Sequence, residues 1–289
     1  MALLGLAACN TTIGGQKPVG GSVDTDAEIQ RFLRHAYLDL SGKAPVDAEL
    51  ADATARLRDD GNTPSARAAL VDELSARPAF AATWIEELEN GIFGGATLTD
   101  QYAFVCGIIR GVVEACASCT AQDACTCQCG PLPQYLAERT DLATTAADLT
   151  GGATTSSVER RYAAAAGYFA LAGSLEGRVR TLFDDFLARP AEPDELENGR
   201  AMIVGSLLPG SPAGLMFHRH GATYADLLDI VFDSEVYREA IVRRVFNRLL
   251  AREPSSLELQ HFTPTLDAND PDARPIVRAV LSSREYFAQ

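Results

Sequence analysis

The chain has 289 residues, 47% of them hydrophobic, and a formal net charge of −14. That charge excludes a nucleic-acid-binding surface, which would need clustered lysine and arginine, and the hydrophobic content excludes a disordered chain. Alanine and leucine dominate, and valine or isoleucine rarely alternates with polar residues, so we predict an all-α protein. Its length allows two compact bodies or one elongated array.

Residues 1–22 have the composition of a signal followed by a flexible tether. Leu6-Ala7-Ala8-Cys9 resembles the lipobox of bacterial lipoproteins, whose cysteine is acylated and becomes the N-terminus after cleavage. The resemblance implies lipidation at Cys9. Asn10 in place of aspartate further implies an outer-membrane location, on the periplasmic or the cell-surface face. The alternative is a cytosolic protein with an apolar N-terminus; no other segment approaches the length of a membrane span.

Residues 23–95 form the first predicted helical module. Its first helix opens at a capping box, Thr25 with Glu28, and ends near Gly42. Another helix begins at Thr63-Pro64, where a capping residue precedes proline at the first helical position.

The end of this module carries the only tryptophan of the chain. Trp84 belongs to an apolar stripe at helical spacing, and the acidic residues between face away from it, namely Glu86, Glu87 and Glu89. We therefore interpret Trp84 as a core residue rather than as a platform for a ligand.

Residues 96–150 are predicted to interrupt the helical array as a cysteine-rich loop insertion. It holds six of the seven cysteines: Cys106, Cys116, Cys119, Cys125, Cys127 and Cys129. If Cys9 marks export, the compartment is oxidising, and the even number predicts three disulfides. We expect none between Cys125 and Cys127, because a bond between cysteines two apart would be strained.

A metal site is the alternative for these cysteines. Cys116-x-x-Cys119 with two of the later thiols could form a four-thiolate zinc or iron–sulfur site, although the second group lacks the matched spacing of a pair. Covalent haem is disfavoured because histidine follows neither Cys119 nor Cys129. We expect no cofactor.

Residues 151–240 form the second predicted module and residues 241–289 the third. In the second, a capping box of Ser156 with Glu159 is predicted to open a helix. In the third, Asp270-Pro271 is predicted to cap and open the last long helix.

The three modules are related by an internal repeat. Phe246 aligns with Tyr37 at an offset of 209 residues and with Phe183 at an offset of 63. The later parts of the copies also match in order. One copy is too short to bury both sides of its helices, so we expect stacked neighbours and predict that these three rings are equivalent buried positions.

For the remaining candidate site residues, the sequence favours structural positions over metal binding or catalysis. His218 and His220 could be metal ligands, but no carboxylate or third histidine lies nearby, so an exposed loop is favoured. His35 and His261 are expected at packing or surface positions. No nucleophile elbow, phosphate loop or paired-carboxylate motif is present, so we predict no catalytic residue and no enzyme.

The segment from Val242 to Pro254, with the ending at 281–286, resembles a small helical module of bacterial surface proteins that is itself similar to the phycobilisome linker module. The segment from His35 to Pro45 resembles a helical domain of planctomycete envelope proteins. The resemblances imply a scaffold outside the cytoplasm. We expect a non-enzymatic, lipid-anchored envelope protein that docks other envelope or surface proteins, as a homo- or hetero-oligomer. The alternative is an extracytoplasmic metal or redox protein, and a hydrolase is a distant third.

Overall fold

A computed structural model describes residues 24–96, 98, 100–103, 132–206 and 211–289. The predicted tether, the lipidation site Cys9 and the cysteine cluster lie outside the described residues, the cluster comprising Cys106, Cys116, Cys119, Cys125, Cys127 and Cys129. The lipid anchor and the disulfides therefore stay predictions.

The described chain is mostly helical, which confirms the all-α prediction, and its strands form one short antiparallel hairpin. The elements are α1 (Asp26–Ser41), α2 (Asp47–Asp59), α3 (Pro64–Ser75), α4 (Pro78–Ile92), α6 (Leu132–Leu142), α7 (Thr145–Thr150), α8 (Thr155–Ala164), α9 (Ala166–Leu171), α10 (Leu175–Leu182), the π-helix η2 (Phe183–Leu187), α11 (Pro193–Val204), β1 (Gly214–Met216), β2 (Arg219–Gly221), α12 (Tyr224–Phe232), α13 (Glu235–Leu250), α14 (Ser256–Phe262), the 3-10 helix η3 (Thr263–Thr265), α15 (Arg274–Ser282) and α16 (Arg284–Phe287).

Two helix starts in the first module lie where the sequence predicts them. At α1, the Thr25 hydroxyl accepts a hydrogen bond from the Glu28 amide, and the Glu28 carboxylate accepts one from the Thr25 amide, which satisfies two free backbone donors. At α3, Thr63 caps the helix and Pro64 occupies the first turn. The buried residues of α1 follow the expected helical spacing: Ile29, Phe32, Leu33, Ala36, Tyr37 and Leu40.

Three local predictions are wrong. The last long helix starts at Arg274, not at Asp270-Pro271, because that segment is bound to the start of α8: the Pro271 carbonyl accepts from Ser156, and Thr154 donates to Asp270.

The other two concern α8 and the predicted insertion. Thr154, not Ser156, caps α8, so Glu159 lies inside the helix and is buried. Residues 132–150, placed in a loop insertion by the sequence, instead form α6 and α7, and α7 packs against α4.

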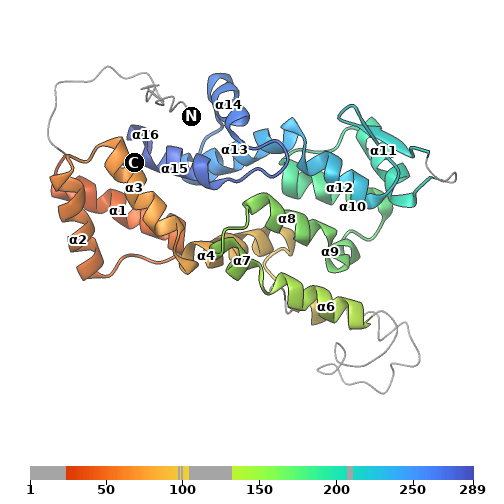
Figure 1. Cartoon of the computed structure of the whole chain (residues 1–289), viewed down its shortest axis with the longest axis horizontal. Coiled ribbons are helices and arrows are strands. Elements are labelled where there is room, and N and C mark those ends of the chain that lie inside the picture. The colour runs from red at the N-terminus through yellow and green to blue at the C-terminus, as the bar shows by residue number, and fades with distance from the viewer. Residues whose placement is uncertain (1–23, 97, 99, 104–131, 207–210) are drawn as a thin grey trace, which may run out of the picture.

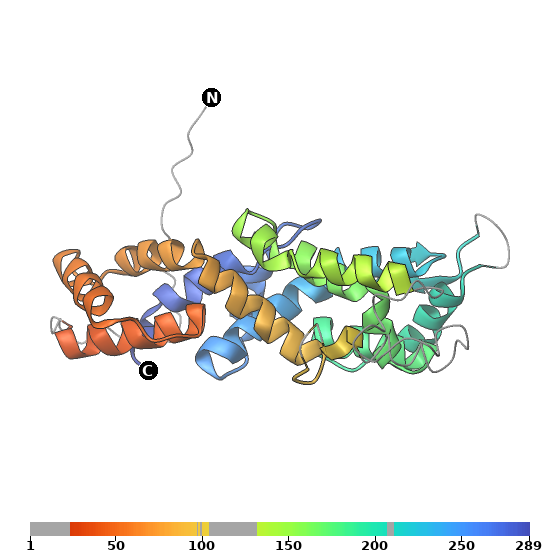
Figure 2. The same cartoon turned by 90° about the horizontal axis from the view of Figure 1, so that it is seen from below.

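The helices form an elongated body (Figures 1 and 2). Helices α1, α2 and α3 lie at one end, and α10, α11 and the hairpin lie at the other. Helix α13 runs between them, contacting η2 and α12 on one side and α15 and α16 on the other. One hydrophobic core extends from Ile29 to Phe287, and the predicted division at residues 95, 150 and 240 stays a prediction. Among the described helices, none is both long and apolar enough to cross a membrane.

Helices distant in the sequence close the N-terminal end of the body. The ring of Phe32 contacts those of Tyr286 and Phe287, with centroids 5.9 and 5.6 Å away. Arg67 is buried and donates to the Ser282 carbonyl at 3.0 Å, so α3 is hydrogen-bonded to the end of α15. The first helices therefore complete their core only with residues at least 215 positions later in the chain.

Candidate functional site

Three helix–helix junctions share one polar arrangement. Junction 3 joins α13 to α14, where Ala251 ends the helix in the left-handed conformation, with φ 51°. The Arg252 guanidinium then makes two hydrogen bonds to the Glu258 carboxylate, at 2.8 and 3.0 Å, and lies 5.1 Å from the centroid of the Phe246 ring. Hydrogen bonding from Arg252, together with the Ser255 amide, lowers the pKa of Glu258 to about 2 against the opposing effect of burial.

Junction 2 joins η2 to α11 and repeats this geometry. Ala188 is left-handed with φ 52°, and Arg189 makes two hydrogen bonds to Glu195, at 2.6 and 2.8 Å. The Arg189 guanidinium lies 5.0 Å from the centroid of the Phe183 ring.

Junction 1 joins α1 to α2 and obtains its arginine from elsewhere. Gly42 is the left-handed residue, with φ 65°, and Lys43 stands where the other junctions have arginine. Arg77, at the start of α4, instead donates to Glu49 at 3.1 Å and lies 5.6 Å from the centroid of the Tyr37 ring. All three junctions thus combine a left-handed residue, a guanidinium on an aromatic ring and a helix-capping glutamate.

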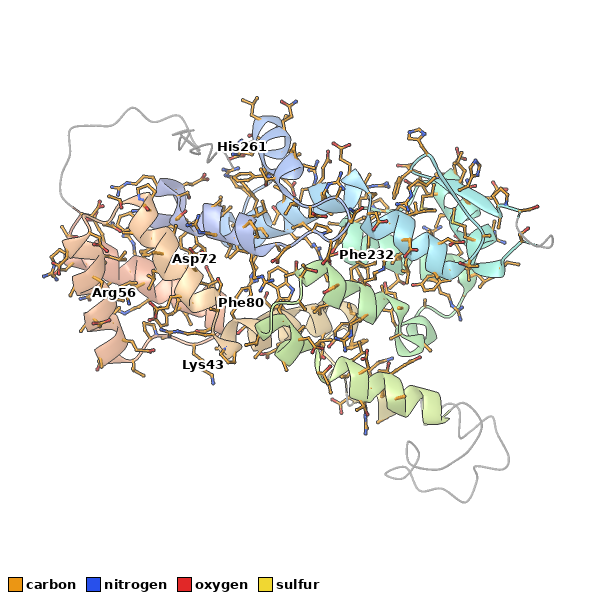
Figure 3. All side chains as sticks on the ribbon, viewed as in Figure 1. Lys43, Arg56, Asp72, Phe80, Phe232 and His261 are labelled. Carbon is orange, nitrogen blue, oxygen red and sulfur yellow. The ribbon has the colours of Figure 1, made fainter. Side chains whose placement is uncertain are left out.

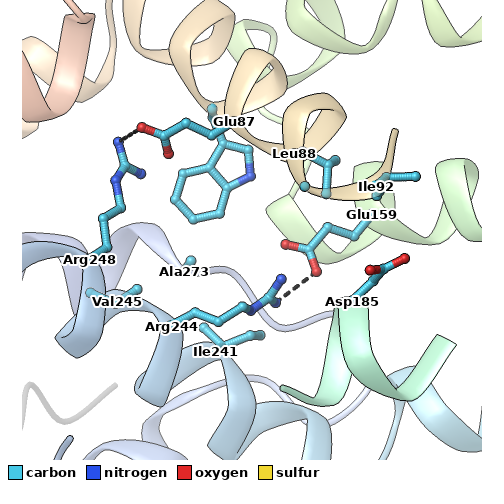
Figure 4. A pocket seen from close by; sticks show the side chains of 12 residues that line it. Glu87, Leu88, Ile92, Glu159, Asp185, Ile241, Arg244, Val245, Arg248 and Ala273 are labelled. Carbon is cyan, nitrogen blue, oxygen red and sulfur yellow. Dashed lines mark hydrogen bonds and ion pairs between the residues drawn. The ribbon is translucent and has the colours of Figure 1, made fainter. Parts of the chain in front are cut away.

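A cavity of about 220 Å³ lies between α4 and α13 (Figure 4). Residues of α8 and η2 also line it. Its walls are largely apolar, but five charged groups face into it. The lining residues are Trp84, Glu87, Leu88, Gly91, Ile92, Glu159, Asp185, Ile241, Arg244, Val245, Arg248 and Ala273.

Two ion pairs cross the cavity between helices. Arg248 of α13 contacts Glu87 of α4 at 2.8 Å, and the Arg248 guanidinium lies 5.6 Å from the centroid of the Trp84 ring. Arg244, one helical turn earlier, contacts Glu159 of α8 at 2.8 Å. Figure 4 shows the pair of Arg248 with Glu87 and the pair of Arg244 with Glu159 on separate sides of the space.

The Glu159 carboxylate is buried, with 1% of the residue exposed, and it also accepts a hydrogen bond from the Tyr237 hydroxyl at 2.9 Å. A buried carboxylate needs such partners because it has lost its water. The pair of Glu159 with Arg244 therefore forms a fixed polar wall.

Asp185 is placed in the cavity by the π-helix η2. Single π-helical turns are rare, and they occur frequently at functional sites. The Tyr168 hydroxyl donates to Asp185 at 2.9 Å. Burial raises the pKa of Asp185 to about 6, with Asp184 acting in the same direction and Tyr168 and Arg244 opposing it. Arg244, however, is already ion-paired with Glu159, so Asp185 carries a charge without its own cation.

Sequence reasoning missed this site. Trp84 does pack against the core, as predicted, but it also lines the cavity, and Glu87 contacts Arg248 instead of facing away. One sequence signal could have indicated the charged face: Arg244 and Arg248 are four residues apart on α13, so they share a face with its apolar residues.

The histidines lie away from the cavity. His218 and His220 are exposed, as predicted, but in a hairpin whose turn residues Phe217 and His218 have φ values of 48° and 62°. His35 is exposed on α1. His261 is exposed on α14 (Figure 3). Within the described residues, no three side chains are grouped as a metal site would require.

The predicted equivalent rings are all buried: 5% of Tyr37 and 0% of both Phe183 and Phe246 are exposed. No protein-family model, curated protein or solved structure matches the chain. The resemblances to surface-protein and envelope modules therefore stay predictions.

Proposed function

We propose that the chain is a non-enzymatic cell-envelope lipoprotein, anchored through Cys9 and acting as a structural or docking component of a surface assembly. Its partners are other envelope or surface proteins. The body built by the three helical modules extends from the tether and presents a long outer surface to them. Repeated helical units commonly offer extended surfaces of this kind.

The main support comes from the three junctions. Each has a left-handed residue and a capping glutamate at matching positions of the aligned segments, and each has a guanidinium on a ring, which in junction 1 comes from Arg77. We infer that the segments are copies of one module. The recurring polar groups bond to one another rather than face a common reactive centre, and this use of polar residues favours a scaffold over an enzyme.

Cys9→Ser tests the anchor. The substitution removes the only acylation site proposed, so the variant should move from the membrane fraction to the soluble fraction and lose incorporation of labelled fatty acid. A Cys127→Ser variant, which keeps Cys9, is the matched control and should stay in the membrane fraction. Unchanged membrane attachment of the Cys9 variant would contradict the proposal.

The metal or redox alternative is tested on the cysteine cluster. The lipoprotein proposal expects three disulfides among Cys106, Cys116, Cys119, Cys125, Cys127 and Cys129, each contributing about 2–4 kcal/mol by restricting the unfolded chain. Mass spectrometry of the exported protein, alkylated without reduction, should show no free thiol among them. Six alkylated thiols, or zinc or iron in stoichiometric amount, would favour the alternative.

A further inference from the structure

Gly91 lines the cavity between α4 and α13. This residue lies in the last turn of α4, where glycine is less favourable for a helix than alanine. A Cβ atom built at Gly91 would have no atom within 4 Å, so packing does not require the glycine. A larger side chain at this position would instead extend into open space beside the cavity.

The charges of the cavity do not balance. Three carboxylates line it, those of Glu87, Glu159 and Asp185, against two guanidinium groups, those of Arg244 and Arg248. Glu87 and Glu159 are each paired with one arginine, which leaves a formal charge of −1 at Asp185. Around Asp185, Tyr168 comes from α9, Asp184 from η2 and Arg244 from α13.

The apolar side chains that line the cavity favour a ligand with an apolar part next to the charge of Asp185. Leu88 and Ile92 come from α4, and Ile241 and Val245 from α13. A cavity of about 150 Å³ is enough to hold a benzene ring, so about 220 Å³ holds one ring with a short polar arm. The volume of the cavity, its apolar lining and the negative charge of Asp185 together favour one class of ligand.

We propose that this cavity binds a small organic cation, an alkylammonium group carried on a compact apolar body. The ammonium group donates hydrogen bonds to Asp185, and the body packs between α4 and α13 beside Trp84. The ligand supplies a positive charge for Asp185, because both arginines already form ion pairs with other carboxylates. This site is independent of the lipid anchor and of the docking role.

Trp84 makes the test direct, because it is the only tryptophan of the chain and it lines the cavity. Cyclohexylmethylammonium is titrated into the full-length protein at neutral pH, with tryptophan fluorescence and calorimetry as readouts. Cyclohexylmethanol and cyclohexanecarboxylate serve as neutral and anionic probes of similar size. The ammonium probe should bind at least about tenfold more tightly than the alcohol, and the carboxylate most weakly.

Three variants locate the binding. Asp185→Asn should reduce affinity for the ammonium probe about tenfold and leave the alcohol unchanged. Asp72→Asn is the control: Asp72 is a carboxylate on α3 that accepts a hydrogen bond from Arg278 and lies outside the cavity, so the affinities should not change. Gly91→Leu should place a bulky side chain at the wall of the cavity and weaken binding of both probes.

Three outcomes would overturn the proposal. The first is the absence of saturable binding by the ammonium probe. The second is an alcohol that binds as tightly as the ammonium. The third is an ammonium affinity that Asp185→Asn leaves unchanged, because the charge would then have no part in recognition.

Discussion

The junctions and the cavity use charged residues in opposite ways. In junctions 2 and 3 a guanidinium is matched to a capping glutamate, and the arrangement recurs. In the cavity, Asp185 and Arg248 stand at the same position of two aligned segments, 63 residues apart, yet they carry opposite charges and line one space. The arrangement shared by junctions 2 and 3 joins consecutive helices, whereas this position, where the two segments differ, contributes two opposite charges to the cavity.

Phe246→Ala should have the largest effect, because it removes the ring on which Arg252 lies in junction 3. The ring is fully buried, so the substitution should lower the free energy of unfolding by about 3–5 kcal/mol. Denaturant unfolding measures the change. Leu257→Ala is the control on the neighbouring helix, and since 77% of Leu257 is exposed, a change within about 0.5 kcal/mol is expected. A similar loss in both variants would show that the junction ring is not a core position.

Asp185→Asn should have an intermediate effect, and it should raise the free energy of unfolding rather than lower it. Since burial raises the pKa of Asp185 from 3.8 to about 6, ionising it in the folded protein costs free energy. That cost is absent below about pH 4, grows as the pH rises to 6, and is complete above it. At pH 7 the asparagine variant should therefore be more stable by about 2 kcal/mol.

The pH profile provides the check on this prediction. Unfolding curves of the wild type and of Asp185→Asn should converge near pH 4. Equal stability of the two proteins at pH 7 would show that Asp185 carries no unfavourable charge, and the contrast between cavity and junctions would then disappear.

Ala251→Gly should have the smallest effect. Alanine is strained in the left-handed conformation that glycine adopts freely. The free energy of unfolding of the variant should therefore rise by about 0.5–1 kcal/mol, after the added flexibility of the unfolded chain is subtracted. Ala188→Gly should give the same sign, and Gly42→Ala the opposite one. Thermal unfolding of the three variants would reveal a junction that departs from the shared geometry.

Patterns among neighbouring residues in the sequence predicted some helix starts well, but they predicted the cavity poorly. The capping box at Thr25 and the proline start at Thr63-Pro64 are confirmed, because their hydrogen bonds involve neighbours in the sequence. The start at Asp270-Pro271 is wrong, because contacts with α8 override the local preference. Glu159 had the spacing of a capping residue, and only the fold places it opposite Arg244, 85 residues away.

The contact between α3 and α15 has a consequence for how the protein is made. Arg67 on α3 donates to the carbonyl of Ser282, 215 residues later, and Asp72 accepts from Arg278. During synthesis α1 to α3 therefore emerge long before their partners and keep apolar surface exposed until residues 274–287 arrive. Such distant pairing slows folding. If the chain is exported, as we propose, this delay keeps the first helices unfolded while the chain is translocated.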